Sequence, residues 1–288
     1  MQYRLWRAAT WLFRLLPLRC GYAIADAAGV ATFWLWPRGR RNVLRNYRRV
    51  LPEAGESDRR RIARRSFQNY CRYLVDFLRL PGTPAEAARL AGQGADAFGA
   101  LDRALEAGRG AIVVCMHFGN WDMGAAATAA RGYAGAALGE RFGDPRLDAM
   151  VFGGRRRLGV EVFPVDGPLM GPARHLRRNG VLALLIDQPD PASGVEVTFF
   201  GARTSVPRGP ARLALSTGAA PGVAAFPRIN RDRPEVGVLA EFSEQPCGGD
   251  KDAAIATLTQ WFMSAHERFI RRYPDQWYMF RDMWPDAP

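Results

Sequence analysis

Apolar residues recur along this chain with two alternating periods, and the alternation predicts strands separated by helices. Short, almost wholly apolar runs such as Ala111–Met116 and Val181–Ile186 are typical of strands that are buried on both faces of a sheet. Elsewhere apolar residues return every three or four positions, which is the period of a helix with one buried face. The expected strands are 111–116, 133–138, 160–165, 181–186, 195–200, 219–226 and 235–242, and the expected helices are 58–80, 85–90, 98–107, 122–130, 145–158, 173–178 and 253–272. This order predicts an α/β fold with a largely parallel sheet covered by helices on both faces.

The first 37 residues are the most apolar region of the chain. Leu5, Trp6 and Leu12 fall on one face of a predicted helix, and arginines lie on or beside the other face. Such a helix can lie in a bilayer interface. A second apolar stretch, Cys20–Pro37, is barely long enough to cross a bilayer. We interpret it as a half-buried helix on the protein or in the interface, with a membrane span as the alternative; no pattern of a cleaved signal peptide is present.

Composition adds a strong positive charge to this picture. The chain carries 40 Lys and Arg against 28 Asp and Glu, a formal net charge of +12, which indicates an anionic partner. Arginines cluster at 38–49 and 59–65, directly after the apolar, Trp-rich stretch. This arrangement favours the anionic surface of a membrane over nucleic acid, because no stacking aromatics or groove-reading motif accompany the arginines. The four cysteines form no CxxC pair and there are three histidines, so we expect a reducing compartment and no metal centre.

One histidine stands at the end of a predicted strand. His117 follows the run 111–116, and Asp122 comes five residues later at the start of an Ala-rich helix. A histidine oriented by a carboxylate is a plausible general base, because its unperturbed pKa lies near neutrality. Taken alone, a buried histidine at a strand end is the competing interpretation.

The surrounding sequence resembles a known family. His117-Phe-Gly-Asn-Trp-Asp122 is similar to the HxxxxD motif of the lysophospholipid (glycerolipid) acyltransferase superfamily. Further blocks match in family order, and the chain most resembles the branch of the lipid A late acyltransferases and phosphatidylinositol mannoside acyltransferases. These blocks are Gly139-Glu140-Arg141-Phe142, Arg155 four residues before Gly159, Asp187-Gln188, Gly194-Val195-Glu196, and Pro274-Asp275-Gln276-Trp277-Tyr278-Met279.

The resemblance implies a glycerol-3-phosphate acyltransferase-like core and a specific chemistry. Residues 1–50 would be the membrane-associating helices and basic segment, and residues 51–288 a single acyltransferase domain on the cytoplasmic face of a bacterial inner membrane. The enzyme would move a fatty acyl group from acyl-CoA or acyl carrier protein to a hydroxyl of a lipid-borne acceptor, with no cofactor besides this co-substrate. His117 would be the general base and Asp122 its orienter. The residues that would bind substrate are Glu140, Arg155, Asp187, Gln188 and Glu196.

Several points stay open at the level of sequence. Donors for the thioester oxyanion could be the backbone amides of Phe118–Asn120 or a nearby arginine. Lipid A enzymes usually carry Glu at the position of Asp122, so a glycolipid other than lipid A is a fair candidate for the acceptor. A hydrolase of the same acyl thioesters and a non-catalytic protein that binds anionic membranes are the alternative functions.

Overall fold

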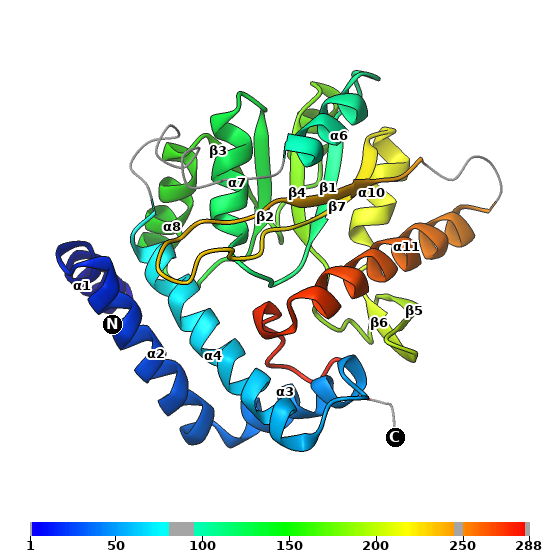
Figure 1. The fold of residues 1–288 in the computed structure, drawn as a ribbon. Coiled ribbons are helices and arrows are strands. Elements are labelled where there is room, and N and C mark those ends of the chain that lie inside the picture. The colour runs from blue at the N-terminus through cyan, green and yellow to red at the C-terminus, as the bar shows by residue number, and fades with distance from the viewer. Residues whose placement is uncertain (1, 81–94, 245–249, 286–288) are drawn as a thin grey trace.

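The core of the protein is a six-stranded sheet (Figure 1). The computed structural model describes residues 2–80, 95–244 and 250–285. The strands lie in the order β3-β2-β4-β1-β7-β8, and all neighbours run parallel except β7 and β8. The expected α/β fold with a largely parallel sheet is therefore confirmed. The strands are β1 (Ala111–Cys115), β2 (Gly135–Gly139), β3 (Val160–Pro164), β4 (Val181–Leu185), β7 (Ala220–Ala225) and β8 (Leu239–Phe242).

Helices cover both faces of this sheet. Alternate side chains of a strand point to opposite faces, and β1 packs accordingly. Val113 and Cys115 join the cluster formed by α6 and α7, whereas Ile112 and Val114 join the cluster formed by α9, α10 and α11. Because β1 is buried at every position, its sequence is an unbroken apolar run. The covering helices are α6 (Ala95–Leu105), α7 (Trp121–Ala130), α8 (Pro145–Arg157), α9 (Met170–Arg177), α10 (Gly209–Thr217) and α11 (Lys251–Arg272).

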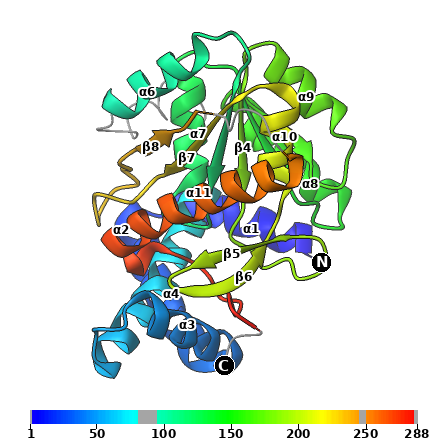
Figure 2. The ribbon, with the colours of Figure 1, turned by 90° about the vertical axis from the view of Figure 1, so that its right-hand side faces the viewer.

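A two-stranded ribbon lies apart from the main sheet, beyond α11 (Figure 2). It pairs β5 (Val195–Phe199) with β6 (Ala202–Val206) in antiparallel register. The turn between them has positive φ at Phe200 and Gly201, as in the tight turns that suit the twist of a hairpin. The strand β6 was not expected, because its sequence Ala-Arg-Thr-Ser-Val carries little apolar signal.

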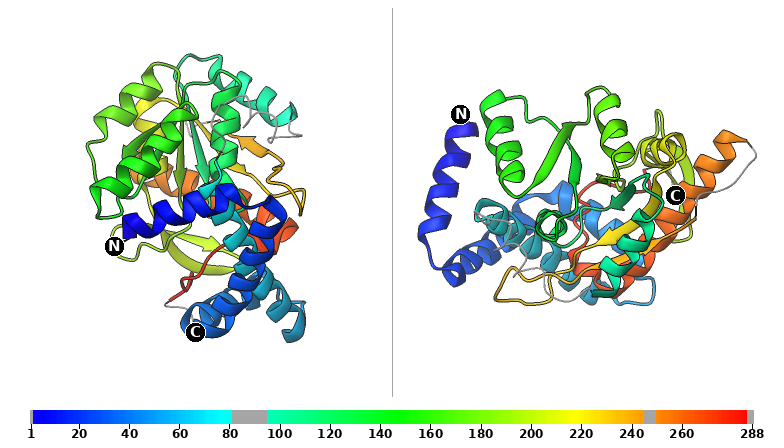
Figure 3. Two further views of the ribbon diagram at one scale, coloured as in Figure 1. Left: turned by 90° about the vertical axis from the view of Figure 1, so that its left-hand side faces the viewer. Right: turned by 90° about the horizontal axis from the view of Figure 1, so that it is seen from above.

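The N-terminal helices gather at one side of the sheet (Figure 3). They are α1 (Gln2–Leu15), α2 (Leu18–Leu35), α3 (Pro37–Val50) and α4 (Glu56–Leu78). The helices α2 and α4 approach closely at Gly29, where an added Cβ would lie 2.5 Å from the Cα of Gln68. Sequence patterns missed α3 as a helix, because its arginines mask a buried stripe that includes Val43, Tyr47 and Val50. The helix expected at 85–90 lies outside the described residues.

The helix α1 has apolar side chains on two faces. Trp6 and Phe13 pack inward, and the Trp6 ring meets the ring of Phe77 edge-on at 6.0 Å. On the other side, large apolar residues are exposed, including Leu5 at 62% and Trp11 at 67%. Within the described residues, none of the helices combines the length and the apolar character that crossing a bilayer would require.

Candidate active site

A sharp turn carries His117 from β1 to the start of α7. Its backbone is fixed by hydrogen bonds with the C-terminal segment, with Phe226 and with Asp187. The amide of Gly119 donates to the carbonyl of Gln276 at 2.9 Å, and the carbonyl of His117 accepts from Tyr278 at 2.8 Å. Gly119 has a φ of +62°, and a Cβ there would lie 2.0 Å from the carbonyl oxygen of Phe226. The turn therefore requires glycine at this position.

The carboxylate that contacts the His117 ring is Asp187. Its Oδ1 lies 2.8 Å from Nδ1 of His117, and its Oδ2 accepts from the His117 amide and from Nε1 of Trp277, both at 3.0 Å. Asp187 is fully buried. Burial alone would lower the pKa of His117, but the charge of Asp187 and the hydrogen bond to it outweigh burial, so the pKa is raised above 6.5. Burial likewise opposes ionisation of Asp187, yet the imidazole and the three hydrogen bonds hold its pKa below 3.8.

This arrangement sets the roles of the two ring nitrogens. An ionised Asp187 accepts a hydrogen bond from Nδ1–H, which leaves Nε2 with a free lone pair. The ring is 25% exposed and lines the large cavity described below. A histidine in this geometry can act as a general base, with Asp187 orienting its ring.

Asp122 does not have the role expected of it. Its carboxylate accepts hydrogen bonds from Nε of Arg155 at 2.6 Å and from the hydroxyl of Tyr73 at 2.7 Å, and it is buried. The charge of Asp122 outweighs the burial of Arg155 and raises the pKa of the guanidinium. The assignment of Asp122 as orienter of the ring is thus wrong for this structure: it stands in the first turn of α7, where it pairs with α8 and α4. Between Asp122 and the turn, the ring of Trp121 meets the His117 ring edge-on at 5.4 Å.

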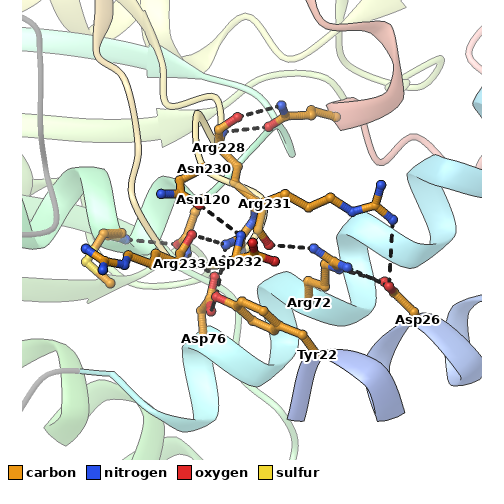
Figure 4. A network of polar contacts seen from close by, with 12 residues as sticks. Tyr22, Asp26, Arg72, Asp76, Asn120, Arg228, Asn230, Arg231, Asp232 and Arg233 are labelled. Atoms are coloured by element: carbon orange, nitrogen blue, oxygen red, sulfur yellow. Dashed lines mark hydrogen bonds and ion pairs between the residues drawn. The ribbon is translucent and has the colours of Figure 1, made fainter. Parts of the chain in front are cut away.

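A second buried network holds the turn from behind (Figure 4). The side-chain oxygen of Asn120 caps α7, and its amide donates to Asp76 at 2.9 Å. Asp76 also accepts from Tyr22 at 2.6 Å and pairs with Arg228. The amide of Gln276 then bonds both the backbone N–H and the carbonyl of Arg228. Helix α2, helix α4, the His117 turn and the C-terminal segment are thereby joined, a connection that sequence reasoning missed.

A cavity of about 1040 Å³ opens beside His117 and is lined from three sides. Apolar side chains of α6 and the sheet form an apolar arm, whose lining includes the buried residues Phe98, Leu101, Val113, Cys115 and Ala224 and the half-buried Phe242. Aromatic side chains of α1 and α4 line a second side together with Arg155. The third side lies at α9, α10 and the start of α11. Burial raises the pKa of the Cys115 thiol to about 12, which disfavours the thiolate that a nucleophilic role would need.

The remaining predicted residues divide between the cavity and the surface. Glu140 and Gln188 line the cavity with His117, and the charge of Glu140 contributes to the raised pKa of the imidazole. Glu196 does not join them. It is exposed on β5, where it pairs with Arg203 at 3.3 Å, and it is not among the residues that line the cavity. The role expected of Glu196 therefore has no geometric support.

The backbone amides that were candidates for the oxyanion site are already engaged. The amide of Phe118 donates to Met116, and those of Gly119 and Asn120 donate to Gln276 and Phe226. Sequence reasoning also missed Tyr73 and the hydrogen bond from Trp277 to Asp187. The signal for Trp277 was present, since it belongs to the C-terminal block 274–279.

Comparison with known proteins identifies the family of the chain. Residues 2–285 match the model of a family described as "Bacterial lipid A biosynthesis acyltransferase". The chain is 31% identical to the phosphatidylinositol mannoside acyltransferase of Mycobacterium tuberculosis strain H37Rv, over 96% of this chain and 87% of the relative. It is also 31% identical to the protein of the same name from Mycolicibacterium smegmatis, over 96% and 90%. The chain therefore belongs to the bacterial lipid A biosynthesis acyltransferase family, and it is an O-acyltransferase.

Proposed function

We propose that this enzyme transfers a fatty acyl group from a thioester donor, acyl-CoA or acyl carrier protein, to a hydroxyl of a glycolipid. The observation that carries the proposal is the His117–Asp187 pair at the edge of a largely apolar cavity. A hydroxyl is a poor nucleophile, and a positioned base accelerates its attack. The related phosphatidylinositol mannoside acyltransferases favour a sugar-bearing lipid as the acceptor.

The proposed reaction is a direct transfer. Nε2 of His117 removes the proton of the acceptor hydroxyl while its oxygen bonds to the thioester carbonyl carbon. The tetrahedral intermediate then collapses, the C–S bond breaks, and the imidazolium returns its proton to the leaving thiolate. Asp187 stabilises the imidazolium between the two steps, as the buried carboxylate does in other histidine-based acyl transfer. No covalent acyl-enzyme takes part.

Substrate groups are assigned to the cavity by their chemistry. The apolar arm accepts the acyl chain, because its lining is buried and free of charge. Arg155, fixed by Asp122 and lining the cavity, would contact oxygens of the acceptor, with Glu140 nearby. Gln188 also lines the cavity, and its amide forms no hydrogen bond within the described residues. We therefore assign the donor for the oxyanion to Gln188.

The acceptor would reach the site from a membrane. Exposed apolar residues of α1 and the end of α2, with Leu35 82% exposed, form a surface suited to a bilayer interface. Arg38 and Arg41 follow this surface directly and are also exposed. Cationic side chains beside an apolar surface favour anionic headgroups. We place the enzyme on the cytoplasmic face of a bacterial inner membrane, held by residues 1–50.

The test is transfer from radiolabelled acyl-CoA or acyl carrier protein into a glycolipid extract. The His117→Ala variant should still fold and should lose transfer by about 10²- to 10⁴-fold, because the base is gone. Ordinary turnover in the folded variant would refute the assignment. Release of free fatty acid at the same rate with and without acceptor would instead support the thioesterase alternative.

A further inference from the structure

Four cations line the cavity away from the His117–Asp187 pair. We call them the cationic rim: Arg177 at the end of α9, Arg208 just before α10, Arg212 in α10, and Lys251 at the start of α11. Lys251 is the only lysine of the chain. The proposed transfer mechanism uses none of these side chains.

The charges of the rim are largely uncompensated. Arg208 pairs with Asp252, yet its buried Nε has no hydrogen-bond partner. Among the described residues, no hydrogen bond or ion pair engages the side chain of Arg177, Arg212 or Lys251. The arginines inside the protein are different, because Arg155 is matched by a buried carboxylate. Unpaired cations that share a cavity wall form a site for an anion.

The spacing of the rim suits a multiply charged group. Arg208 and Arg212 are four residues apart, so they lie on the same side of α10. The pair between Arg208 and Asp252 brings the start of α11, with Lys251, next to this side. One guanidinium group can donate two parallel hydrogen bonds to two oxygens of a phosphate, and an ammonium group adds a compact positive charge.

The cavity that holds both the rim and His117 also has uncharged side chains in its wall. Pro207, Leu213 and Leu184 line the same cavity and carry no charge. A slender, uncharged chain with a thioester at one end and a phosphate at the other could therefore place its thioester at His117 and its phosphate at the rim of the same cavity. The phosphopantetheine arm has this construction, and both coenzyme A and acyl carrier protein present it.

The position of the rim favours a donor from solution over a membrane phosphate. The start of α11 lies across the molecule from α1, which carries the exposed apolar surface (Figures 1 and 3). A lipid phosphate held beside α1 would have to extend across the molecule to reach the rim. We infer that the cationic rim binds the phosphate groups of the acyl donor's phosphopantetheine arm, an inference that rests on the proposed transfer function for its thioester end.

Equilibrium binding tests the rim without requiring turnover. Isothermal titration would compare coenzyme A with pantetheine, which lacks phosphate, on the wild type and on the double variant Arg212→Gln/Lys251→Gln. We expect the Kd for coenzyme A to rise about tenfold for each lost contact, equivalent to about 1.4 kcal/mol each. The Kd for pantetheine should not change. Arg178→Gln is the matched control. Arg178 directly follows Arg177 in the chain and is exposed, but it does not line the cavity.

Two results would overturn the inference: an unchanged Kd for coenzyme A in the double variant, or an equal loss for coenzyme A and pantetheine. Kinetics then separate the two sources of phosphate. A raised KM for both acyl-CoA and acyl carrier protein supports binding of the shared phosphate, whereas a raised KM for acyl-CoA alone would assign the rim to the nucleotide phosphates and would overturn the inference. A KM unchanged for both donors contradicts the inference. If the wild type binds coenzyme A through the rim but transfers no acyl group, the proposed function fails and the phosphate site stands.

Discussion

Replacing Asp187 with Asn should disable His117 while keeping nearly the same shape. Two donors, the His117 amide and Nε1 of Trp277, point at Oδ2 of Asp187. These donors hold the amide oxygen of Asn at that position, so its NH₂ group faces Nδ1. Nδ1 must then accept a hydrogen bond, which places the ring proton on Nε2, where it blocks the base. A wrong tautomer of this kind costs about 10⁴-fold in kcat, or roughly 5 kcal/mol of transition-state stabilisation.

The assay is acyl transfer at saturating donor and acceptor across a range of pH. In the wild type, activity should rise as pH passes the pKa of His117, which Asp187 raises above 6.5, because only the neutral ring accepts a proton. In the Asp187→Asn variant this pKa falls, so residual activity should level off at a lower pH. Asp122→Asn serves as the control for the pH profile alone, because it leaves the ring's hydrogen bond in place while it weakens the pair that fixes Arg155. A variant at position 187 that keeps more than about a tenth of the wild-type kcat with an unshifted profile would refute this reasoning.

Three further changes probe other parts of the site. Trp277→Phe removes one hydrogen bond from Asp187, so the carboxylate becomes more basic. We expect kcat to fall about tenfold and the pH at which activity rises to increase. Initial rates measured across a range of pH test both. Gly119→Ala should lower the free energy of unfolding by more than about 2 kcal/mol, because the new Cβ would overlap the backbone of Phe226 and the residue has a positive φ. Gly132→Ala, at a φ of +89° in open space, should lower it by about 1 kcal/mol. Chemical denaturation measures both. Val113→Phe should fill the apolar arm and shift kcat/KM toward shorter acyl chains, and a donor series that shows no shift would contradict the placement of the chain.

Much of the fold was predictable because buried parallel strands have an unbroken apolar sequence. The run 111–116 and the run 181–186 both proved to be strands, and each delivers a site residue at its end. The order of strands in the sheet was not predictable, since it depends on packing between segments far apart in the chain. β1 and β4 are neighbours, with Cys115 opposite Leu185. His117 and Asp187 each follow two residues later, so the register places them side by side.

The misassigned carboxylates have a common cause. Asp122 is close to His117 in sequence, but distance along the chain does not determine where a side chain points once a helix begins. Glu196 is placed in a matching motif, but the exposed side of a hairpin turns it toward solvent. In both positions the residue type was compatible with the expected chemistry, and only three-dimensional contacts could decide between the candidates.

The two apolar faces of α1 have a thermodynamic consequence. Many amphipathic segments are disordered in water and lose conformational entropy when they fold on a bilayer, which weakens their binding. In this protein α1 is already a helix, held by Trp6 and by Arg79, whose guanidinium donates to the carbonyl of Leu16 at 2.7 Å. If the proposed membrane contact holds, its outer face would partition into a bilayer as a preformed surface. Nearly all of the apolar area that it buries would contribute to the affinity, and the protein could leave the membrane without unfolding this helix.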